Sequence, residues 1–406
     1  RALGVARAVG VDWVTPQFLL ALSRTLETAP EVVLLAEYAK AVGHKQMALR
    51  LSKIAFSRDL PMGDYALPVG VMPNYKSLLD ERVDPASITK LMTAYLTFSE
   101  LAQGNISEDD TVIVSEKAWK AIGSRMFIEV GSQVTIGELL RGMIIQSGND
   151  ASIALAEHLA GGEDSFAGWM NQHALRLGLQ NTHYMNATGL PHPEHFSSAR
   201  DIAQLARALI TEFPEHYALY SQREYSYAGI TQPNRNKLLW RDESVDGMKT
   251  GYTEAAGYCL VSSASRDGMR LISVVLGTPS ANARIRSSEA LLNYGFRFFE
   301  TVQIAAASEP LAEAKVWKAA QEKLPLGAAS AVYVTIPRGR QEDLALKPVM
   351  EERLLAPITA GDTVGELQLT LADEPLRQVP LVALADNPLG SLWQRLRDEV
   401  WLLLKR

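Results

Sequence analysis

The sequence predicts an α/β protein of the α+β type, in which helices and strands share one domain, with a helical segment before it and a small all-β domain after it. Three observations lead to this prediction. Residues 1–60 have helical periodicity and helix-capping residues, residues 84–300 place most of their helices before their strands, and residues 301–385 hold short apolar runs between turn residues. Because 406 residues are too many for a single compact core, we expect two or three domains.

The first 60 residues predict three helices. Thr15-Pro16 is a helix N-cap followed by proline at the first helical position. Pro30 opens a second helix, which Gly43 closes, and a third covers residues 45–56. Short joints between helices of this length predict stacked helical hairpins. Residues 60–75 are rich in proline and glycine and predict a linker.

The middle of the chain predicts helices that pack against a sheet. Asp84-Pro85 opens one helix, the capping box Thr135-Ile136-Gly137-Glu138 opens another, and further helices begin near Asp150, Asp164 and Ser198. The apolar runs 258–264 and 270–277 predict adjacent strands joined by a turn at 265–268. The predicted domains are a helical segment with its linker (1–75), an α/β domain (76–300), an all-β domain (301–386) and a terminal helix (387–406).

Composition and charge exclude several classes of protein. Hydrophobic residues make up 47% of the chain and charged residues 21%, as in ordinary globular proteins. The net charge of −6 gives no electrostatic reason to expect a nucleic acid as a partner. The single cysteine, Cys259, excludes a disulfide bond within the chain. No apolar run reaches the length of about 18 residues that a membrane-spanning helix needs.

Three short motifs carry chemically useful residues: Ser87-Ile88-Thr89-Lys90, Ser147-Gly148-Asn149 and Lys249-Thr250-Gly251. Each is common by itself, since a chain of this length holds about one S-x-x-K by chance. Their context is more specific. Ser87 lies in the first turn of a predicted helix, where free backbone N–H groups and the helix dipole favour an alkoxide. Lys90 lies one turn further, so its amine can reach the Ser87 hydroxyl.

The other two motifs also occupy positions that suit a cleft. Ser147-Gly148-Asn149 lies between two predicted helices, where a turn can present a hydroxyl and an amide. Lys249-Thr250-Gly251 enters an apolar strand region, and Gly251 permits a substrate backbone to approach closely. Serine needs an adjacent base to attack a peptide carbonyl. No His–Asp pair has the context of a catalytic triad, so Lys90 is the expected base.

In their order, the three motifs resemble the S-x-x-K, S-x-N and K-T-G signature of penicillin-recognising serine enzymes. The resemblance extends through DPASITKLMT, IIQSGNDASIALAEH, QPNRNKLLW, VDGMKTGYT, RLISVVLG and LLNYGFRFFETV. On these stretches, residues from about 80 to 406 are identified as a member of the low-molecular-weight penicillin-binding proteins, the serine-type D-alanyl-D-alanine carboxypeptidases. The resemblance implies a β-lactamase/transpeptidase-like catalytic domain followed by a small β-sandwich. It also implies a hydrolase that trims peptidoglycan pentapeptides without a cofactor and is acylated by penicillins and other β-lactams.

The resemblance also implies roles for particular residues. Ser87 would be the nucleophile, and burial and the nearby charge of Lys249 would lower the pKa of Lys90 so that it can act as base. Ser147 would relay a proton to the leaving D-alanine, and Asn149 would hold the substrate amide.

Further positions would bind the substrate. The backbone N–H groups of Ser87 and Tyr252 would form the oxyanion hole. Arg284 matches the position of a cation for the terminal carboxylate of the substrate, with Thr250 and Thr253 as further donors.

Other candidate residues favour structural roles. His192 and His195 form an H-x-x-H without an apparent third ligand, so we expect no metal site. Cys259 lies inside an apolar strand and is expected to be a packed thiol. Arg235 is expected to brace a loop rather than to touch substrate.

The terminal helix is amphipathic. Its apolar residues are Leu389, Trp393, Leu396, Val400, Trp401, Leu403 and Leu404, and its basic residues are Arg395, Arg397, Lys405 and Arg406. Such a helix can dock on its own protein, but tryptophans and basic residues at a chain end favour a position in a membrane surface. The terminal anchor of the family points the same way. We therefore expect a periplasmic protein attached peripherally to the outer face of the inner membrane.

The beginning of the chain departs from the family. Members of the family have strands 25–40 residues ahead of the nucleophile, and here residues 45–80 hold a different sequence with one plausible short strand, DYALPVGV. Residues 1–75 instead resemble the helical segment of a soluble lytic transglycosylase. Without the strands, we expect the site to keep its geometry while the strand at 270–277 exposes one edge. Two alternatives remain: a non-catalytic cell-wall-binding protein, and a β-lactamase, although no E-x-x-L-N setting occurs between Asn149 and Lys249.

Overall fold

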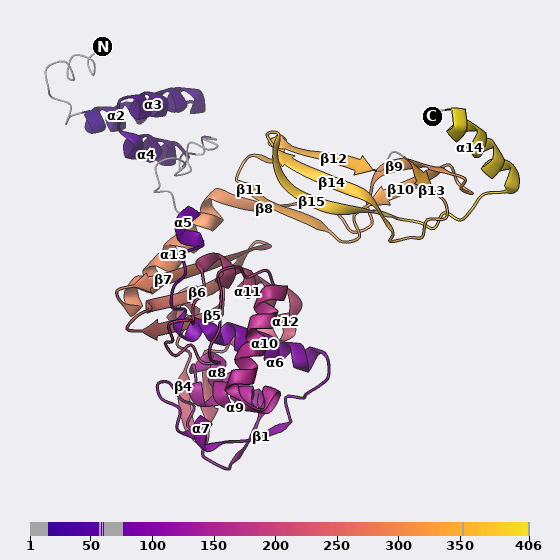
Figure 1. Cartoon of the computed structure of the whole chain (residues 1–406). Helices are drawn as coiled ribbons and strands as arrows, with labels where there is room; N and C mark the ends of the chain where they lie inside the picture. Colours follow the sequence, from indigo (N-terminus) through magenta and orange to yellow (C-terminus); the bar gives the residue numbers. More distant parts are fainter. Residues whose placement is uncertain (1–14, 57, 59, 61–75, 351–352, 405–406) are drawn as a thin grey trace. The chain divides into compact units, whose positions relative to one another are not determined.

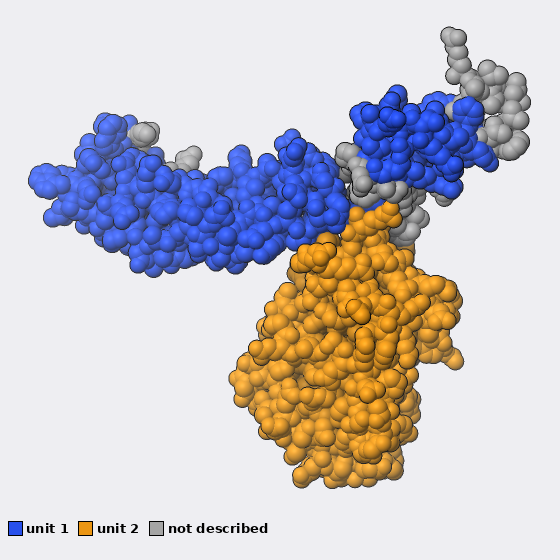
Figure 2. All heavy atoms as spheres, turned by 180° about the vertical axis from the view of Figure 1, so that it is seen from behind, with its two compact units in different colours: residues 1–71, 298–406 blue, residues 72–297 orange. Residues whose placement is uncertain are grey.

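The computed structural model describes residues 15–56, 58, 60, 76–350 and 353–404 (Figure 1). Contacts within the chain divide it into two compact units, which Figure 2 shows in different colours. One unit is Met72–Arg297, and the other comprises Arg1–Val71 and Phe298–Arg406. The three predicted motifs all lie in the first of these units.

The N-terminal helices form as predicted. They are α2 (Thr15–Ser23), α3 (Ala29–Ala41) and α4 (Lys45–Phe56). The Glu31 side chain accepts hydrogen bonds from the backbone and hydroxyl of Thr28, which caps α3. The helices share a small core of Leu19, Leu35, Ala36, Ala39, Ala48 and Leu51. The possible strand DYALPVGV and most of the predicted linker lie outside the described residues.

A three-stranded antiparallel sheet supports the unit Met72–Arg297. Its strands are β5 (Val245–Thr253), β6 (Gly257–Arg266) and β7 (Met269–Thr278), in the order β5-β6-β7. The two predicted strands are thus confirmed as β6 and β7. Asp267 and Gly268 join them, and both have positive φ, 48° and 77°. This is the backbone that a two-residue hairpin turn requires, and Asp-Gly provides it readily.

Helices cover both faces of this sheet (Figure 1). On one face, α13 (Ala281–Phe298) places Ile285 and Leu292 in a core with Val245, Leu260 and Ala264. On the other face, Cys259 and Val261 join the largest core of the chain. The helices contributing to that core include α6 (Lys90–Ala102), α8 (Ile136–Ile145), α9 (Asn149–Ala160), α10 (Glu163–Arg176) and α11 (Ala199–Glu212).

The predicted helix starts in this unit are confirmed. The Thr135 hydroxyl accepts from the backbone of Glu138, whose carboxylate accepts from the backbone of Thr135, which completes the capping box of α8. The helices α9, α10 and α11 begin at or beside Asp150, Asp164 and Ser198. Shorter elements complete the unit: α5 (Lys76–Leu79), η3 (Ala86–Thr89), α7 (Glu116–Trp119), α12 (Pro214–Tyr217), η4 (Ala218–Ser221), η5 (Lys237–Trp240), and the strand pairs β1 (Thr111–Ile113) with β2 (Gln133–Thr135) and β3 (Glu224–Tyr227) with β4 (Ile230–Pro233).

One edge of the sheet carries no further strand within the described part of the chain. There β7 pairs with β6 alone, so its other side has no strand partner. This is the edge that we expected to be exposed if the strands that precede the nucleophile in the family are lacking. The edge is on the opposite side of the sheet from β5, which carries the third motif.

The residues after Phe298 form the predicted all-β region and a final helix. A six-stranded sheet has the order β12-β14-β15-β10-β9-β13, and β8 and β11 form a separate pair. The strands are β8 (Phe299–Ala305), β9 (Pro310–Trp317), β10 (Lys323–Gly327), β11 (Val332–Pro337), β12 (Leu344–Met350), β13 (Leu354–Leu355), β14 (Thr363–Leu371) and β15 (Glu374–Ala383), followed by α14 (Leu392–Leu404). Leu367 and Leu369 of β14 pack with Val334 and Ile336 of β11, so side chains of both sheets share a core. None of the described helices is both long and apolar enough to cross a membrane.

Candidate active site

Hydrogen bonds to the Asp84 side chain stabilise the turn that carries Ser87. One oxygen of the Asp84 carboxylate accepts a hydrogen bond from the backbone of Ala86 at 2.7 Å, and the other accepts from the Thr253 hydroxyl at 3.1 Å. Asp84 thereby links the start of η3 to the end of β5. Ser87 is the second residue of η3, where a backbone N–H has no acceptor within the helix and remains available to a ligand.

Lys90 is buried beside Ser87, with only 1% of its surface exposed. Its Nζ lies 3.0 Å from Ser87 Oγ, 2.7 Å from Asn149 Oδ1 and 2.7 Å from the carbonyl oxygen of Thr188. Burial lowers the pKa of Lys90 to about 7, while Asp150 and Glu163 act in the opposite direction. A neutral amine in this place can donate two N–H groups to Asn149 and Thr188 and direct its lone pair at the Ser87 hydroxyl.

A second buried lysine contacts the second motif. Lys249 Nζ donates to Ser147 Oγ at 2.7 Å and to the carbonyl oxygen of Thr250 at 3.0 Å. Burial and the charge of Lys90 lower the pKa of Lys249 well below its ordinary value. Ser147 has a left-handed backbone with φ of 68°, which is uncommon for a serine. The turn between α8 and α9 therefore directs the hydroxyl of Ser147 towards β5.

Asn149 connects the second motif to the first and to a loop. Its Oδ1 accepts from Lys90, while its Nδ2 donates to the carbonyl oxygen of Ile122 at 2.6 Å. The backbone N–H of Asn149 donates to the carbonyl oxygen of Ser124 at 2.7 Å. A Cβ at Gly123 would lie 2.9 Å from Nδ2, so glycine leaves the room that this amide needs. The orientation of the Asn149 side chain is thus set from both of its ends.

The loop that supplies the carbonyl of Thr188 was not recognised from the sequence. The Asn186 side chain organises it by accepting from the backbones of Thr188, Gly189 and Leu190. Gly189 has φ of 83°, and a Cβ there would lie 1.8 Å from the carbonyl oxygen of Ala86. The loop therefore packs directly on the residue before Ser87. The role of a backbone carbonyl cannot be predicted from residue types, although Gly189 indicates a position where the backbone is closely packed.

Arg284 lies beside the third motif. Its Nη1 donates to the carbonyl oxygens of Gly251 at 3.0 Å and Cys259 at 3.3 Å. Its guanidinium carbon lies 5.5 Å from the centre of the Tyr258 ring, and the half-exposed Tyr252 lies over the same ring with centroids 4.3 Å apart. The Nε of Arg284 is buried without a hydrogen-bond partner in the described part of the chain. The two carbonyl contacts thus hold the guanidinium beside β5 and β6.

The third motif itself differs in part from the expectation. A Cβ at Gly251 would meet Pro85 O at 3.1 Å and Ala86 Cβ at 3.2 Å, so the close approach that needs glycine is to the turn before Ser87. The Thr253 hydroxyl donates to Asp84 and accepts from the backbone of Ala256. It is therefore engaged within the protein. Thr250 is buried, with 7% exposure.

The remaining candidates, Arg235, His195 and Cys259, make contacts within the protein. Arg235 donates to the side chains of Gln146 and Ser124 and so braces the loop ahead of Asn149. Both ring nitrogens of His195 are engaged, one with Thr89 and one with the backbone of Met185, and burial lowers its pKa to about 4. The Cys259 thiol is fully buried, which raises its pKa. Within the residues that the structure describes, no group of three His, Cys, Asp or Glu side chains could hold a metal ion.

Comparison with known proteins identifies the two main regions. Residues 75–280 match the family model described as D-alanyl-D-alanine carboxypeptidase, and residues 299–388 match the C-terminal domain of penicillin-binding protein 5. Both models begin after residue 74, so the likeness of residues 1–75 to a lytic transglycosylase stays a prediction.

Individual relatives agree with the family models. The D-alanyl-D-alanine carboxypeptidase DacC of Escherichia coli is 44% identical over 332 residues, which cover 80% of this chain and 83% of that protein. DacA of the same organism is 41% identical over 80% of this chain and 82% of its own. The crystal structure of penicillin-binding protein 5 from Haemophilus influenzae aligns with a TM-score of 0.71 at 39% identity, covering 76% of this chain and 92% of that chain. The motif residues, the fold and these matches together establish that this chain belongs to the serine-type D-alanyl-D-alanine carboxypeptidase family.

Proposed function

We propose that this protein removes the terminal D-alanine from peptidoglycan pentapeptides through an acyl-enzyme on Ser87. The observation that carries the proposal is the pairing of Ser87 Oγ with Lys90 Nζ at 3.0 Å. A serine hydroxyl is a weak nucleophile without an adjacent base. A lysine is a base near neutral pH only when its pKa is strongly lowered, and burial brings the pKa of Lys90 to about 7.

Acylation follows from the contacts of Ser87 and Lys90. The Ser87 hydroxyl gives its proton to the neutral amine of Lys90 while Oγ bonds to the carbonyl carbon of the penultimate D-alanine. Asn149 and Thr188 accept from the amine, so its lone pair faces Ser87 until the proton is transferred. The backbone N–H groups of Ser87 and Tyr252 stabilise the charge that develops on the carbonyl oxygen.

The leaving group then needs a proton. Ser147 passes its hydroxyl proton to the departing D-alanine nitrogen and takes in exchange the proton that Lys90 received from Ser87, so Lys90 is neutral again. Lys249 orients the Ser147 hydroxyl through the 2.7 Å hydrogen bond. Water hydrolyses the ester on Ser87, which frees the shortened peptide and restores the hydroxyl. In a penicillin the same attack opens the β-lactam ring, and the leaving nitrogen stays attached to the acyl group.

Recognition of the substrate depends on its terminal carboxylate. Arg284 is the cation beside the third motif, and its contact with the carbonyl of Gly251 and its place over Tyr258 support a carboxylate-binding role. Thr250 and Thr253 belong to the same end of β5. Because the Thr253 hydroxyl is bonded to Asp84, we assign Thr253 to support of the Ser87 turn in the absence of substrate.

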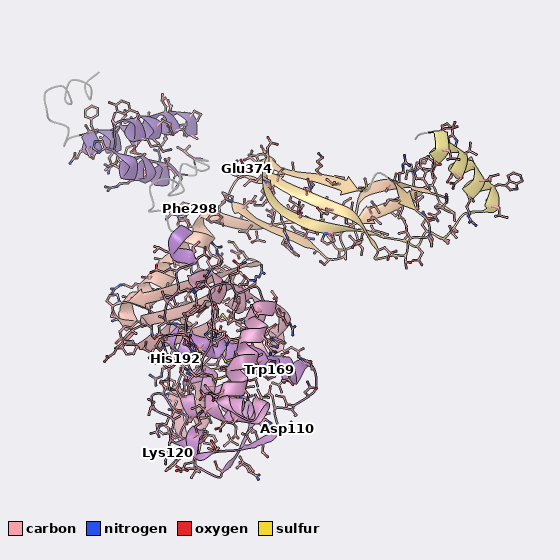
Figure 3. The ribbon with its side chains drawn as sticks, in the orientation of Figure 1. Asp110, Lys120, Trp169, His192, Phe298 and Glu374 are labelled. Carbon is pink, nitrogen blue, oxygen red and sulfur yellow. The ribbon has the colours of Figure 1, made fainter. Side chains whose placement is uncertain are left out.

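The test is covalent labelling with a fluorescent penicillin. Ser87→Ala should abolish labelling, and Lys90→Ala should nearly abolish it, because Lys90 is the base that contacts the Ser87 hydroxyl in the described part of the chain. Lys120→Ala is the matched control, since Lys120 lies on the surface at the end of α7 (Figure 3). Labelling that survives Ser87→Ala would overturn the assignment. A wild-type chain that takes up no label while folded would favour a non-catalytic cell-wall-binding protein.

We further propose that α14 attaches the protein peripherally to the outer face of the inner membrane, in the periplasm. Its apolar residues are exposed, among them Trp393 at 81%, Leu396 at 60% and Trp401 at 53%. A polar contact fixes the helix at its other side: the buried Asp398 accepts from the backbone of Lys318 at 2.7 Å. A helix held by a polar contact with its apolar residues exposed is suited to lie in a lipid surface.

Vesicle sedimentation tests this attachment. Asn387 exchanges hydrogen bonds with Gln321 inside the β domain, so a truncation should begin at Ser391 to leave that domain intact. The truncated chain should remain in solution and keep its peptidase activity. Leu396→Ser should weaken vesicle binding, whereas Leu355→Ser, at an exposed leucine of β13, should not. Truncated chain that still sediments with the vesicles would contradict the proposal.

A further inference from the structure

Asp150 is a buried carboxylate next to the second motif, and the mechanism above does not use it. It is the second residue of α9 and has no exposed surface. Its side chain accepts four backbone hydrogen bonds, from Met126 at 3.0 Å, Phe127 at 2.9 Å, Ile128 at 3.4 Å and its own neighbour Ala151 at 2.9 Å. A carboxylate has the acceptor capacity for such a set, and an amide does not.

Three of the four partners of Asp150 belong to the loop that also holds Asn149. This loop, residues 122–128, accepts from Asn149 at its beginning, through the carbonyl oxygens of Ile122 and Ser124. At its end it donates to Asp150 through three successive N–H groups. Two adjacent residues of α9 therefore fix the two ends of the 122–128 loop. The loop in turn determines where the amide of Asn149 lies and hence how Asn149 meets Lys90.

The charge of Asp150 has a second consequence. Lys90 and Lys249 are both buried, and the charge of Lys90 disfavours the protonation of Lys249. The negative groups that oppose the fall in the pKa of Lys90 are Asp150 and then Glu163. The side chain of Glu163 retains 11% exposure and is bonded to Lys117, whereas Asp150 is fully buried. A buried charge acts through a medium of low polarity and is screened little by solvent.

We propose that Asp150 is a positioning residue of this site, which anchors the 122–128 loop against Asn149 and supplies the buried negative charge that keeps Lys90 basic enough to accept the proton of Ser87. The inference rests on the proposed role of Lys90 as base. The charged and titratable groups that act on Lys90 are Asp150 on α9 and Glu163 on α10. Tyr227 on β3 interacts with Asp150, and Lys249 on β5 interacts with Lys90, Arg235 and Arg284.

The test is the pH dependence of the penicillin acylation rate in Asp150→Asn. Loss of the negative charge favours the neutral amine, so the rise of the rate with pH should move to lower pH by about one unit or more. The maximal rate should fall about tenfold, because the 122–128 loop loses acceptors and Asn149 shifts. Asp150→Glu keeps the charge and should leave the pH of half-maximal rate near its wild-type value. A purely structural role would lower the rate equally at every pH.

Asp201→Asn is the matched control. Asp201 is a buried carboxylate in the first turn of α11, and it accepts from the backbone of Asn181 and the hydroxyl of Thr182. Its substitution should lower stability without moving the pH profile. An unshifted profile in Asp150→Asn would overturn the proposal.

A further variant covers the case in which Asp150→Asn does not fold. Asp150→Ser removes the charge without placing amide donors against the three loop N–H groups, and it should show the same shift of the profile. Failure of both variants to fold while Asp201→Asn folds would overturn the proposal, since Asp150 would then be a residue of the core. A wild-type chain without any rise of the rate with pH would refute the role of Lys90 instead, which distinguishes the two failures.

Discussion

Gly189→Ala should damage the site from a position that carries no functional group. The Cβ would lie 1.8 Å from the carbonyl oxygen of Ala86, and real Cβ contacts essentially never fall below 3.0 Å. Either the peptide between Ala86 and Ser87 or the loop with Thr188 must therefore move by at least 1.2 Å. The first movement displaces Ser87, the proposed nucleophile, and the second withdraws the carbonyl that accepts from Lys90.

The expected loss of activity follows from that displacement. A misplacement of about 1 Å in a catalytic group costs about 100-fold in rate, so acylation by penicillin should fall by at least about that factor. The left-handed backbone at Gly189 adds a cost of about 1–2 kcal/mol for any side chain. Gly104→Ala is a control that has the backbone strain without the steric clash, because Gly104 has φ of 72° and nothing within 4 Å of its Cβ position.

The assay compares acylation rates and melting temperatures of the two variants. Both should melt at lower temperature than the wild-type chain, since both carry an alanine with positive φ. Only Gly189→Ala should lose acylation when measured well below its melting temperature. A folded Gly189→Ala chain that acylates at the wild-type rate would refute the packing argument, as would an equal loss of acylation in Gly104→Ala.

Three further predictions concern the charges of the site. Acylation of the wild-type chain should rise about tenfold per pH unit below pH 7 and level off above it, because Lys90 must be neutral and its pKa is about 7; rapid-mixing measurements with a chromogenic β-lactam check this. Because the pKa of Lys90 in the folded chain lies below its ordinary value of 10.5, the unfolded chain binds the proton more tightly between those two pH values and stability rises with pH there. From pH 6 to pH 9 the unfolding free energy of the wild-type chain should therefore rise by about 2–3 kcal/mol more than that of Lys90→Met. Relative to Lys120→Met it should show no such gain. If the unfolding free energies of the wild-type chain and Lys90→Met change with pH in parallel, the burial argument is wrong. Arg284→Ala should lower kcat/KM about 10–100-fold for peptides ending in a free carboxylate, mainly through KM, and much less for peptides whose terminus is amidated.

The local elements were predictable because their signals are local. The capping box Thr135–Glu138 and the N-cap Ser198 work through hydrogen bonds across three residues, so a short stretch of sequence contains both partners. The hairpin of β6 and β7 is equally local, since Asp267 and Gly268 suit the backbone that the turn needs. The sequence missed the short hairpin of β3 and β4, whose strands have only four residues each.

The sequence by itself determined which residues could carry the chemistry. The order and spacing of Ser87, Lys90, Ser147, Asn149 and Lys249 predicted the family and the residues of its site before any contact was known. Spacing placed Lys90 one turn after Ser87, so local geometry decides how this pair meets.

Only the tertiary structure decided how these groups meet. Lys90 reaches Asn149 and Thr188 across 59 and 98 positions of the chain, and Lys249 reaches Ser147 across 102. Such contacts depend on how helices pack on the sheet, which no short pattern encodes. From the sequence we expected Gly251 to let a substrate backbone approach. In the structure, its missing side chain instead leaves room for the turn of Pro85 and Ala86. The burial that lowers the pKa of Lys90 belongs to the packed core as a whole, and for that reason the basicity of Lys90 is a property of the fold.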